Sequence, residues 1–137
     1  SLEQHLSFLD WDYFITIAPE QSMSKQKCFS AMSELYEFIE AFNFGGEVRL
    51  FFTTEPFSNR NGCHNHLILK MDGSIKDVTA FLKKYAPVGR IDVKPYDQEL
   101  AGFFYVCKEG RIGEDWDLLG NKLVENGLQI IKNKIAS

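Results

Sequence analysis

Two strand-like runs joined by a turn-rich segment constrain the fold of this chain more than any other feature. Residues 48–55 and 62–70 are rich in aromatic, branched and other apolar side chains. Residues 56–62 between them contain Pro, Ser, two Asn and Gly, which favour a turn. We therefore expect the two runs to pair as an antiparallel hairpin, with side chains alternating between the two faces of a sheet.

The second run carries two histidines, His64 and His66, which the alternation places on one face. If the hairpin forms, Glu55 at the end of the first run falls beside them. Two imidazoles and one carboxylate could hold a metal ion and leave coordination positions open for water or substrate, as in catalytic sites. Imidazole suits zinc, iron, nickel or copper and carboxylate suits magnesium or manganese, so the ligands leave the ion open. Alternatively, the histidines only hydrogen-bond to neighbours at a strand end.

Length and charge bound the class of protein. The 137 residues suit one domain, 1–137, with a core rich in the 12 phenylalanines. No apolar run is long enough for a membrane span, no secretory pattern opens the chain, and three widely spaced cysteines are typical of reduced thiols, so we expect a cytoplasmic protein with no membrane partner. The net charge of -4 argues against a large nonspecific nucleic-acid surface, and any such contact must be local.

The remaining elements follow from hydrophobic periodicity and from turn and cap residues. We expect strands at 13–18 and 88–95 and helices at 24–42, 74–85, 97–109 and 123–135, while residues 2–10 stay unassigned. The order predicts an α+β fold with a central, mainly antiparallel sheet of four to five strands and helices over one face, in a ferredoxin-like or RNA-recognition-motif (RRM) arrangement. The helices at 24–42 and 74–85 should cover the face that bears Leu67 and Leu69, which leaves the histidine face to the helix expected at 97–109.

The helix expected at 97–109 carries Tyr105 and Lys108, which share a helical face at a spacing of three residues. Tyrosine is a weak nucleophile at its free pKa near 10, so it needs a nearby cation or base to attack an electrophile. Lys108 or a metal-bound phosphate could supply that activation. A tyrosine packed against a lysine stem is the alternative interpretation.

Taken in order, these features resemble the three motifs of HUH endonucleases. The strand Phe14–Ile17, the segment from Thr54 to Leu69 with Glu55 and its two histidines, and the run from Tyr105 to Lys108 are similar to motifs of single-tyrosine rolling-circle replication initiators (Rep). The resemblance covers roughly residues 11–116. The family usually has a bulky apolar residue where this chain has Asn65, and its two-tyrosine branch carries a second tyrosine where this chain has Glu109.

The resemblance implies an HUH fold and metal-dependent nicking and joining of single-stranded DNA at an origin or hairpin sequence, which would initiate rolling-circle replication of a plasmid or virus. Glu55, His64 and His66 would hold a divalent metal ion, Mn or Mg in the family. Tyr105 would attack the scissile phosphate and form a 5'-phosphotyrosine link, and Lys108 would orient the phosphate or a metal-bound water. A larger replication protein or helicase is a possible partner, because the chain has no Gly-x-x-x-x-Gly-Lys loop of its own.

Several basic or aromatic side chains are candidates for contacts with the DNA: Phe57 by stacking on a base, and Arg60, Lys70, Arg90 and Lys94 by neutralising phosphates. Each could equally be ordinary surface or core. Two other functions stay open. One is a non-catalytic RRM-like nucleic-acid-binding module, which would need no metal, and the other is a nonhaem iron oxygenase.

Overall fold

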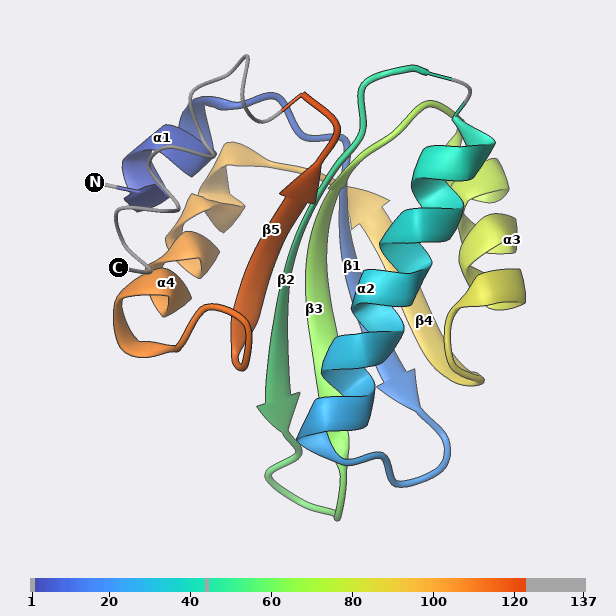
Figure 1. Ribbon diagram of the computed structural model, residues 1–137, viewed down its shortest axis with the longest axis vertical. Helices are drawn as coiled ribbons and strands as arrows, with labels where there is room; N and C mark the ends of the chain where they lie inside the picture. Colours follow the sequence, from blue (N-terminus) through green and yellow to red (C-terminus); the bar gives the residue numbers. More distant parts are fainter. Residues whose placement is uncertain (1, 44, 123–137) are drawn as a thin grey trace.

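The computed structural model describes residues 2–43 and 45–122, so the helix expected at 123–135 lies outside the described residues. Within them, an open five-stranded antiparallel sheet packs against helices in an α+β fold of the ferredoxin-like kind, as expected (Figure 1). The elements are α1 (Leu2–Phe8), β1 (Tyr13–Pro19), α2 (Lys25–Phe42), β2 (Arg49–Pro56), β3 (Cys63–Lys70), α3 (Ile75–Tyr85), β4 (Gly89–Pro95), the 3-10 helix η1 (Gln98–Tyr105), α4 (Val106–Glu109) and β5 (Trp116–Gly120).

The sheet has the strand order β4-β1-β3-β2-β5, so the histidine-bearing strand β3 lies at its centre. The expected hairpin of β2 and β3 is confirmed, with Glu55 opposite His64 and Thr53 opposite His66. On its other side β3 pairs with β1, which places Thr16 opposite His66. In Figure 1 the loops β1–α2, β2–β3 and α3–β4 gather at one end of the sheet, the end at which Glu55 and His64 lie.

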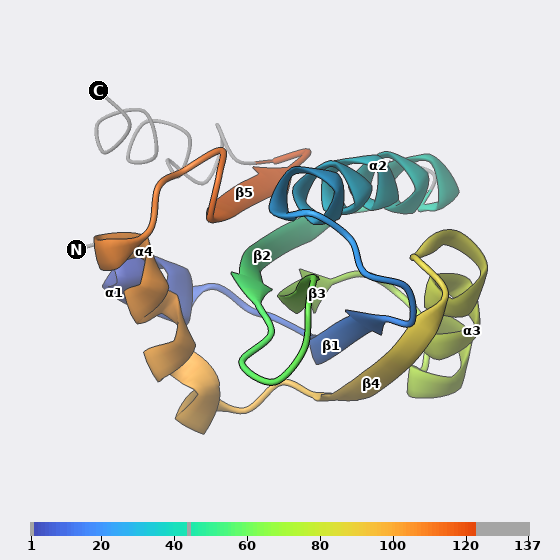
Figure 2. The ribbon, with the colours of Figure 1, turned by 90° about the horizontal axis from the view of Figure 1, so that it is seen from below.

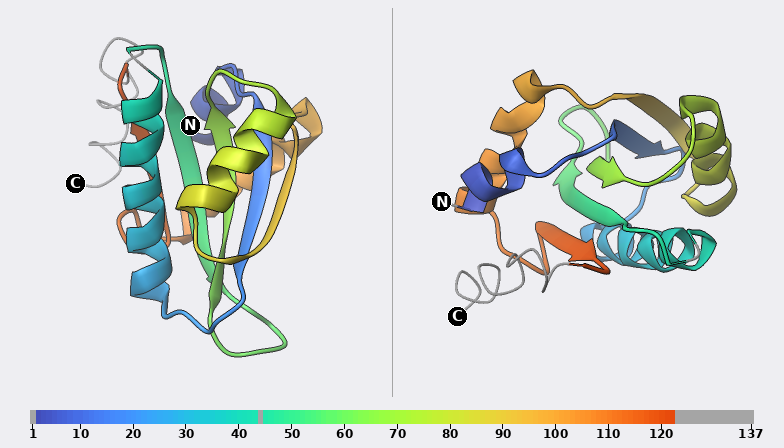
Figure 3. Two further views of the ribbon diagram at one scale, coloured as in Figure 1. Left: turned by 90° about the vertical axis from the view of Figure 1, so that its right-hand side faces the viewer. Right: turned by 90° about the horizontal axis from the view of Figure 1, so that it is seen from above.

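One face of the sheet is covered by α2 and α3, which lie side by side (Figure 3). Ser24 and Ser74 cap these helices, each hydroxyl accepting a hydrogen bond from the backbone N–H three residues later. Their apolar stripes pack on the alternate strand residues that include Leu67 and Leu69, as expected. Burial of this face stabilises the sheet and leaves the residues between, among them both histidines, pointing to the opposite side.

The opposite face is partly covered by α1, η1 and α4 (Figure 2). The helical segment expected at 97–109 lies on this face as predicted, whereas α1 was not expected there. The short helix α1 falls in the stretch left unassigned, and it buries Leu6 beside Trp11 and Phe104 in a second core cluster. A fifth strand, β5, was also not expected; it pairs with β2 and buries Trp116 in the same cluster. This cluster covers the β5 side of the face and ends near His66, which Phe103 of η1 contacts.

The helix expected at 97–109 begins as predicted, because the Asp97 side chain accepts a hydrogen bond from the N–H of Glu99. Its winding differs, since residues 98–105 form a 3-10 helix and only residues 106–109 are α-helical. Gly102 weakens the α-helical preference in the middle of this stretch. Among residues 2–43 and 45–122, no helix combines the length and the apolar character needed to cross a membrane.

Candidate metal centre

Three side chains with metal-binding atoms converge where β2 ends and β3 begins. Each of Glu55, His64 and His66 offers one ligand atom within 4.8 Å of those of the other two. The Nε2 atom of His64 lies 3.9 Å from a carboxylate oxygen of Glu55. The two imidazole rings meet edge to face with their centroids 4.9 Å apart. The predicted hairpin therefore brings together the three side chains expected to bind a metal, and this group could hold a metal ion.

His66 is oriented by a hydrogen bond from a neighbouring strand. Its Nδ1 atom lies 3.1 Å from the hydroxyl oxygen of Thr16 in β1. This contact fits the tautomer in which Nδ1–H donates to Thr16 and the lone pair of Nε2 is available to a metal. Burial, and then the neighbouring His64, lower the pKa of His66, so its imidazole is neutral at pH 7. A neutral, oriented imidazole is the form that binds a metal ion.

The donor set fits a divalent ion. Nitrogen and oxygen ligands about 2.0 to 2.2 Å from one ion lie roughly 3 to 3.5 Å apart from each other. The 3.9 Å between His64 and Glu55 therefore needs only a small movement of a half-exposed carboxylate. Three protein ligands also leave coordination positions for water or substrate. A mixed set of two imidazoles and one carboxylate accepts several divalent ions, so the donors by themselves do not name the metal.

The polar residue between the histidines, Asn65, lies on the other face of the sheet, the one that α2 and α3 cover, and is fully buried. Its Nδ2 atom donates hydrogen bonds to the backbone oxygen of Thr53 and to the hydroxyl of Thr54. Asn65 thus ties β3 to β2 next to the triad, where the resembling family has an apolar side chain. The side chain of Asn65 therefore belongs to the core beneath the site, and both histidines lie on the opposite face.

The segment that carries Tyr105 approaches the triad through Phe103, whose ring lies edge to face with His66 at 5.5 Å between centroids. Tyr105 is 58% exposed, and Lys108 lies over its ring at 4.9 Å from the centroid. The ammonium of Lys108 also pairs with Glu3 of α1 at 2.8 Å, and this hydrogen bond raises its pKa. Within the described part of the chain, no hydrogen bond or ring contact joins Tyr105 or Lys108 to the triad.

The expected DNA-binding side chains are divided between the two ends of the sheet. Arg60 and Arg90 line one groove beside the triad, together with Phe57. Lys94 lies on the histidine face, because it is paired with Phe14 in the β1–β4 register and its ammonium lies 5.2 Å from that ring. Lys70 is at the far end of β3, about 20 Å from His64 at the usual rise of a strand, and it pairs with Asp10.

Three residues of the site were not anticipated from the sequence, namely Phe14, Thr16 and Phe103. Phe14 and Thr16 alternate along the first strand, so their shared face was readable, but their position beside His66 depends on the pairing of β1 with β3. Phe103 belongs to the 3-10 helix η1, and no local sequence pattern predicts the orientation of that helix.

The three cysteines expected to be reduced are free and buried, and none of them belongs to the described ligand set. Burial raises the pKa of Cys28 to about 11 and that of Cys107 to about 12, so these thiols remain protonated at neutral pH.

Comparison of this chain with family models, curated proteins and solved structures gave no match.

Proposed function

We propose that this chain nicks and rejoins single-stranded DNA, with Mn or Mg held by Glu55, His64 and His66 and with Tyr105 as the nucleophile. The observation that carries the proposal is the convergence of the two imidazoles and the carboxylate on the face of the sheet that α2 and α3 leave free. A metal ion held by two histidines and one carboxylate would keep open coordination positions for a phosphate oxygen of a substrate. The order of motifs, which is similar to that of HUH endonucleases, supports Tyr105 as the nucleophile and single-stranded DNA as the substrate.

The proposed reaction transfers one phosphodiester bond. When bound, the metal ion would polarise the scissile phosphate and offset the negative charge that develops in the transition state. The Oη atom of Tyr105 attacks phosphorus, the bond from phosphorus to the 3' oxygen breaks, and the phenolic proton ends on that leaving oxygen. The products are a 5'-phosphotyrosine link and a free 3'-hydroxyl. Reversal by a 3'-hydroxyl rejoins the strand, with no change in oxidation state and no nucleotide cofactor.

We propose that Lys108 supports Tyr105 as the nucleophile. Its ammonium lies over the Tyr105 ring and is kept there by Glu3, which is buried in α1. A fixed positive charge beside the phenol stabilises the negative charge that builds on it as the proton leaves. The same ammonium could orient a phosphate oxygen once DNA is bound, so we assign Lys108 to the reaction without choosing between these two roles.

The substrate would cross the sheet face on the side of β1 and β4. Lys94 and Arg90 lie along this face, since their register partners Phe14 and Ala18 alternate with the residues that point to α3. Arg60 lies at the end of the hairpin loop beside Phe57. The cationic groups are few and local, in keeping with the net charge of -4. We propose that this reaction initiates rolling-circle replication of a plasmid or virus. A larger replication protein or helicase would act with this chain.

The experiment is a denaturing gel that detects a covalent adduct between the protein and random single-stranded oligonucleotides in the presence of Mn. We expect an adduct with the unchanged chain and none with Tyr105→Phe, because the phenylalanine variant lacks the attacking oxygen. Tyr85→Phe is the matched control, since Tyr85 lies in α3 on the other side of the sheet. Sequencing the captured DNA would identify the recognised site.

The same gel separates catalysis from binding alone. An RRM-like module that only binds nucleic acid would retard DNA on a native gel, with or without metal, and would give no adduct under denaturing conditions. Persistence of the adduct in Tyr105→Phe, or its absence with every oligonucleotide tried, would contradict the nicking mechanism.

A further inference from the structure

The two imidazoles of the triad are held in different ways. His66 has a hydrogen-bond partner in Thr16, as metal-binding histidines usually have at the nitrogen that does not bind the ion. His64 is only 16% exposed, and its Nε2 atom is the one directed at Glu55. Its other nitrogen, Nδ1, is buried and has no hydrogen-bond partner among residues 2–43 and 45–122. The ring of His64 therefore needs another source of orientation.

That source is the ring of Phe57 in the β2–β3 loop. The Phe57 and His64 rings are stacked, with 4.7 Å between centroids and 28° between planes. His66 lies edge-on to His64 at a similar distance, so the two rings confine the His64 imidazole from different sides. A stack of this kind limits rotation of the imidazole about its Cβ–Cγ bond, the rotation that would swing Nε2 away from Glu55.

Phe57 is itself fixed. The guanidinium carbon of Arg60 lies 3.8 Å from the centroid of the Phe57 ring. At this distance the guanidinium cannot lie on the face of Phe57 that the His64 ring covers. The Phe57 ring therefore lies between Arg60 and His64. Arg60 in turn donates a hydrogen bond of 2.8 Å to the backbone oxygen of Pro19 at the end of β1. The loop closes through a hydrogen bond of 3.0 Å from the Phe57 N–H to the Gly62 oxygen.

Gly62 makes this closure possible. Its φ of 98° is in the left-handed region, and a Cβ there would meet the backbone of Ser22 and Met23 at 3.1 Å. The N–H of Cys63 donates to the oxygen of Met23, which joins the hairpin to the loop after β1. The loop that presents Phe57 is thus held to the rest of the protein at two points, through Arg60 and through Cys63.

We infer that Phe57 is a positioning residue for the metal site, holding the His64 imidazole in its ligand orientation by stacking, in place of a hydrogen bond. The inference rests on the metal-binding part of the proposed function. It also changes what is expected of Phe57 toward DNA, because the ring has no free face for a base while Arg60 covers it. The Arg60 guanidinium keeps unused N–H donors for a phosphate in the groove it lines with Arg90.

The test compares Phe57→Leu with Phe57→Tyr in the full chain. Leucine keeps apolar volume and removes the stack, whereas tyrosine keeps the stack. We expect Phe57→Leu to weaken Mn binding in calorimetry by about 10- to 100-fold, the range for loss of an outer-shell partner. Phe57→Tyr should bind within about threefold of the unchanged chain, since the aromatic contact is retained.

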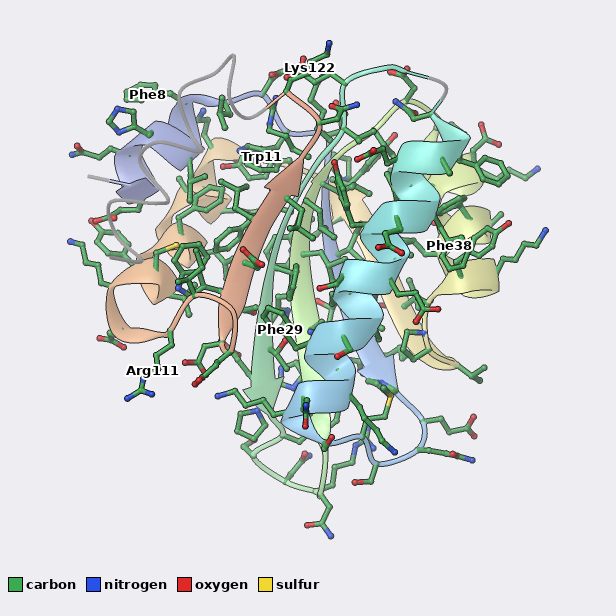
Figure 4. All side chains as sticks on the ribbon, viewed as in Figure 1. Phe8, Trp11, Phe29, Phe38, Arg111 and Lys122 are labelled. Carbon is green, nitrogen blue, oxygen red and sulfur yellow. The ribbon has the colours of Figure 1, made fainter. Side chains whose placement is uncertain are left out.

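Phe38→Leu is a matched control for the loss of an aromatic stack. Phe38 is stacked on Tyr85 at 4.6 Å and 25°, nearly the geometry of the Phe57–His64 pair, and it lies on α2 facing α3 (Figure 4). This variant should lose a similar amount of stability and keep its Mn affinity. If Phe38→Leu weakened Mn binding as much as Phe57→Leu, the effect would belong to general destabilisation and the inference would fail.

A second readout uses the metal-free protein. The proton resonances of the His64 ring should carry a ring-current shift from Phe57 that disappears in Phe57→Leu and persists in Phe57→Tyr. Unchanged His64 resonances and unchanged Mn affinity in Phe57→Leu would overturn the inference and leave the nicking proposal standing. Loss of Mn affinity in Phe57→Leu, together with no DNA adduct from the unchanged chain, would support the inference and refute nicking. If the unchanged chain binds no Mn, both fail.

Discussion

Binding of Mn should stabilise the folded chain, and removing one ligand should abolish that stabilisation. The three ligands come from two adjacent strands and converge only when β2 and β3 are paired, so the unfolded chain does not present the site. At a free Mn concentration 100 times the dissociation constant, the free energy of unfolding should rise by about 2.7 kcal/mol. The stabilisation should not level off when the site is full, because each further tenfold increase in free Mn adds about 1.4 kcal/mol.

His66→Ala is the informative variant because His66 is the ligand held by both a hydrogen bond and ring contacts. The substitution removes the hydrogen bond to Thr16 and the ring contacts with Phe14 and Phe103, so it should cost about 2 to 3 kcal/mol without any metal. The prediction therefore concerns the difference between each protein with and without Mn. That difference should fall from about 2.7 kcal/mol to near zero in His66→Ala. His5→Ala is the control, since His5 lies in α1, outside the triad.

Urea unfolding followed by tryptophan fluorescence measures these differences directly. Both tryptophans, Trp11 and Trp116, are buried in the core cluster on the histidine side of the sheet, so their emission reports loss of that core. The urea dependence of the unfolding free energy should be the same with and without Mn, because the surface exposed on unfolding does not change. The reasoning is refuted if the unchanged chain gains nothing from millimolar Mn, or if His66→Ala gains as much as the unchanged chain.

Two further predictions concern charges away from the triad. The carboxylate of Asp10 accepts hydrogen bonds from Lys70 and from Arg49, and these contacts lower its pKa. A carboxyl group with a lowered pKa stabilises the fold at any pH above its unfolded pKa, which is near 3.9. That contribution is lost as the pH falls through the pKa of the folded state. Asp10→Asn should therefore be less stable than the unchanged chain at pH 7, by about 1 kcal/mol at most because the Asp10 side chain is so exposed. Urea titrations from pH 7 to pH 2 should show this difference in stability shrinking below pH 4. A difference that stays constant over this range would contradict the prediction. Replacing Arg90 and Lys94 together by Gln should weaken single-stranded DNA binding, measured by fluorescence anisotropy. The slope of the logarithm of the binding constant against the logarithm of the salt concentration should become shallower by about 1.4, the value for two lost phosphate contacts. An unchanged slope would show that neither residue belongs to the DNA-binding surface.

The parts of the fold and site that sequence reasoning anticipated are those governed by local rules. The period-two pattern of β3 and the turn residues before it set the hairpin, and the hairpin alone brings Glu55 to His64. The two long helices were readable from their stripes and from the caps Ser24 and Ser74. In each case the decisive contacts lie within about ten residues along the chain.

The features that were missed depend on contacts distant in sequence. Thr16 reaches His66 across 50 positions, and only the pairing of β1 with β3 places it there. The strand β5 is short, and Asp117 interrupts its run of apolar residues. Its burial depends on its pairing with β2. The helix α1 has one described buried apolar residue, Leu6, so its stripe was too short to recognise. These elements could be assigned only once the second face of the sheet was known to need a cover.

The position of Tyr105 shows most clearly how a local rule can be right and still leave the site undetermined. Tyr105 and Lys108 share a face, as predicted, because a spacing of three nearly aligns side chains in both α and 3-10 helices. The direction of that face is another matter, since each residue turns by about 100° in an α-helix and about 120° in a 3-10 helix. Over the seven steps from Gln98 to Tyr105 the two windings diverge by about 140°.

In the 3-10 winding that the chain adopts, successive side chains take three directions. Phe103 contacts His66, Phe104 enters the core beside Trp11, and Tyr105 takes the third direction, toward solvent. Rewinding the same residues as an α-helix from the Asp97 cap would turn Tyr105 by more than a third of a revolution. Because 3-10 helices longer than about four residues are uncommon and often mark hinges, the pitch of residues 98–105 is the variable that decides which ring of this aromatic run faces the metal ligands. The proposed nicking by Tyr105 therefore depends on the winding of this segment as well as on the triad.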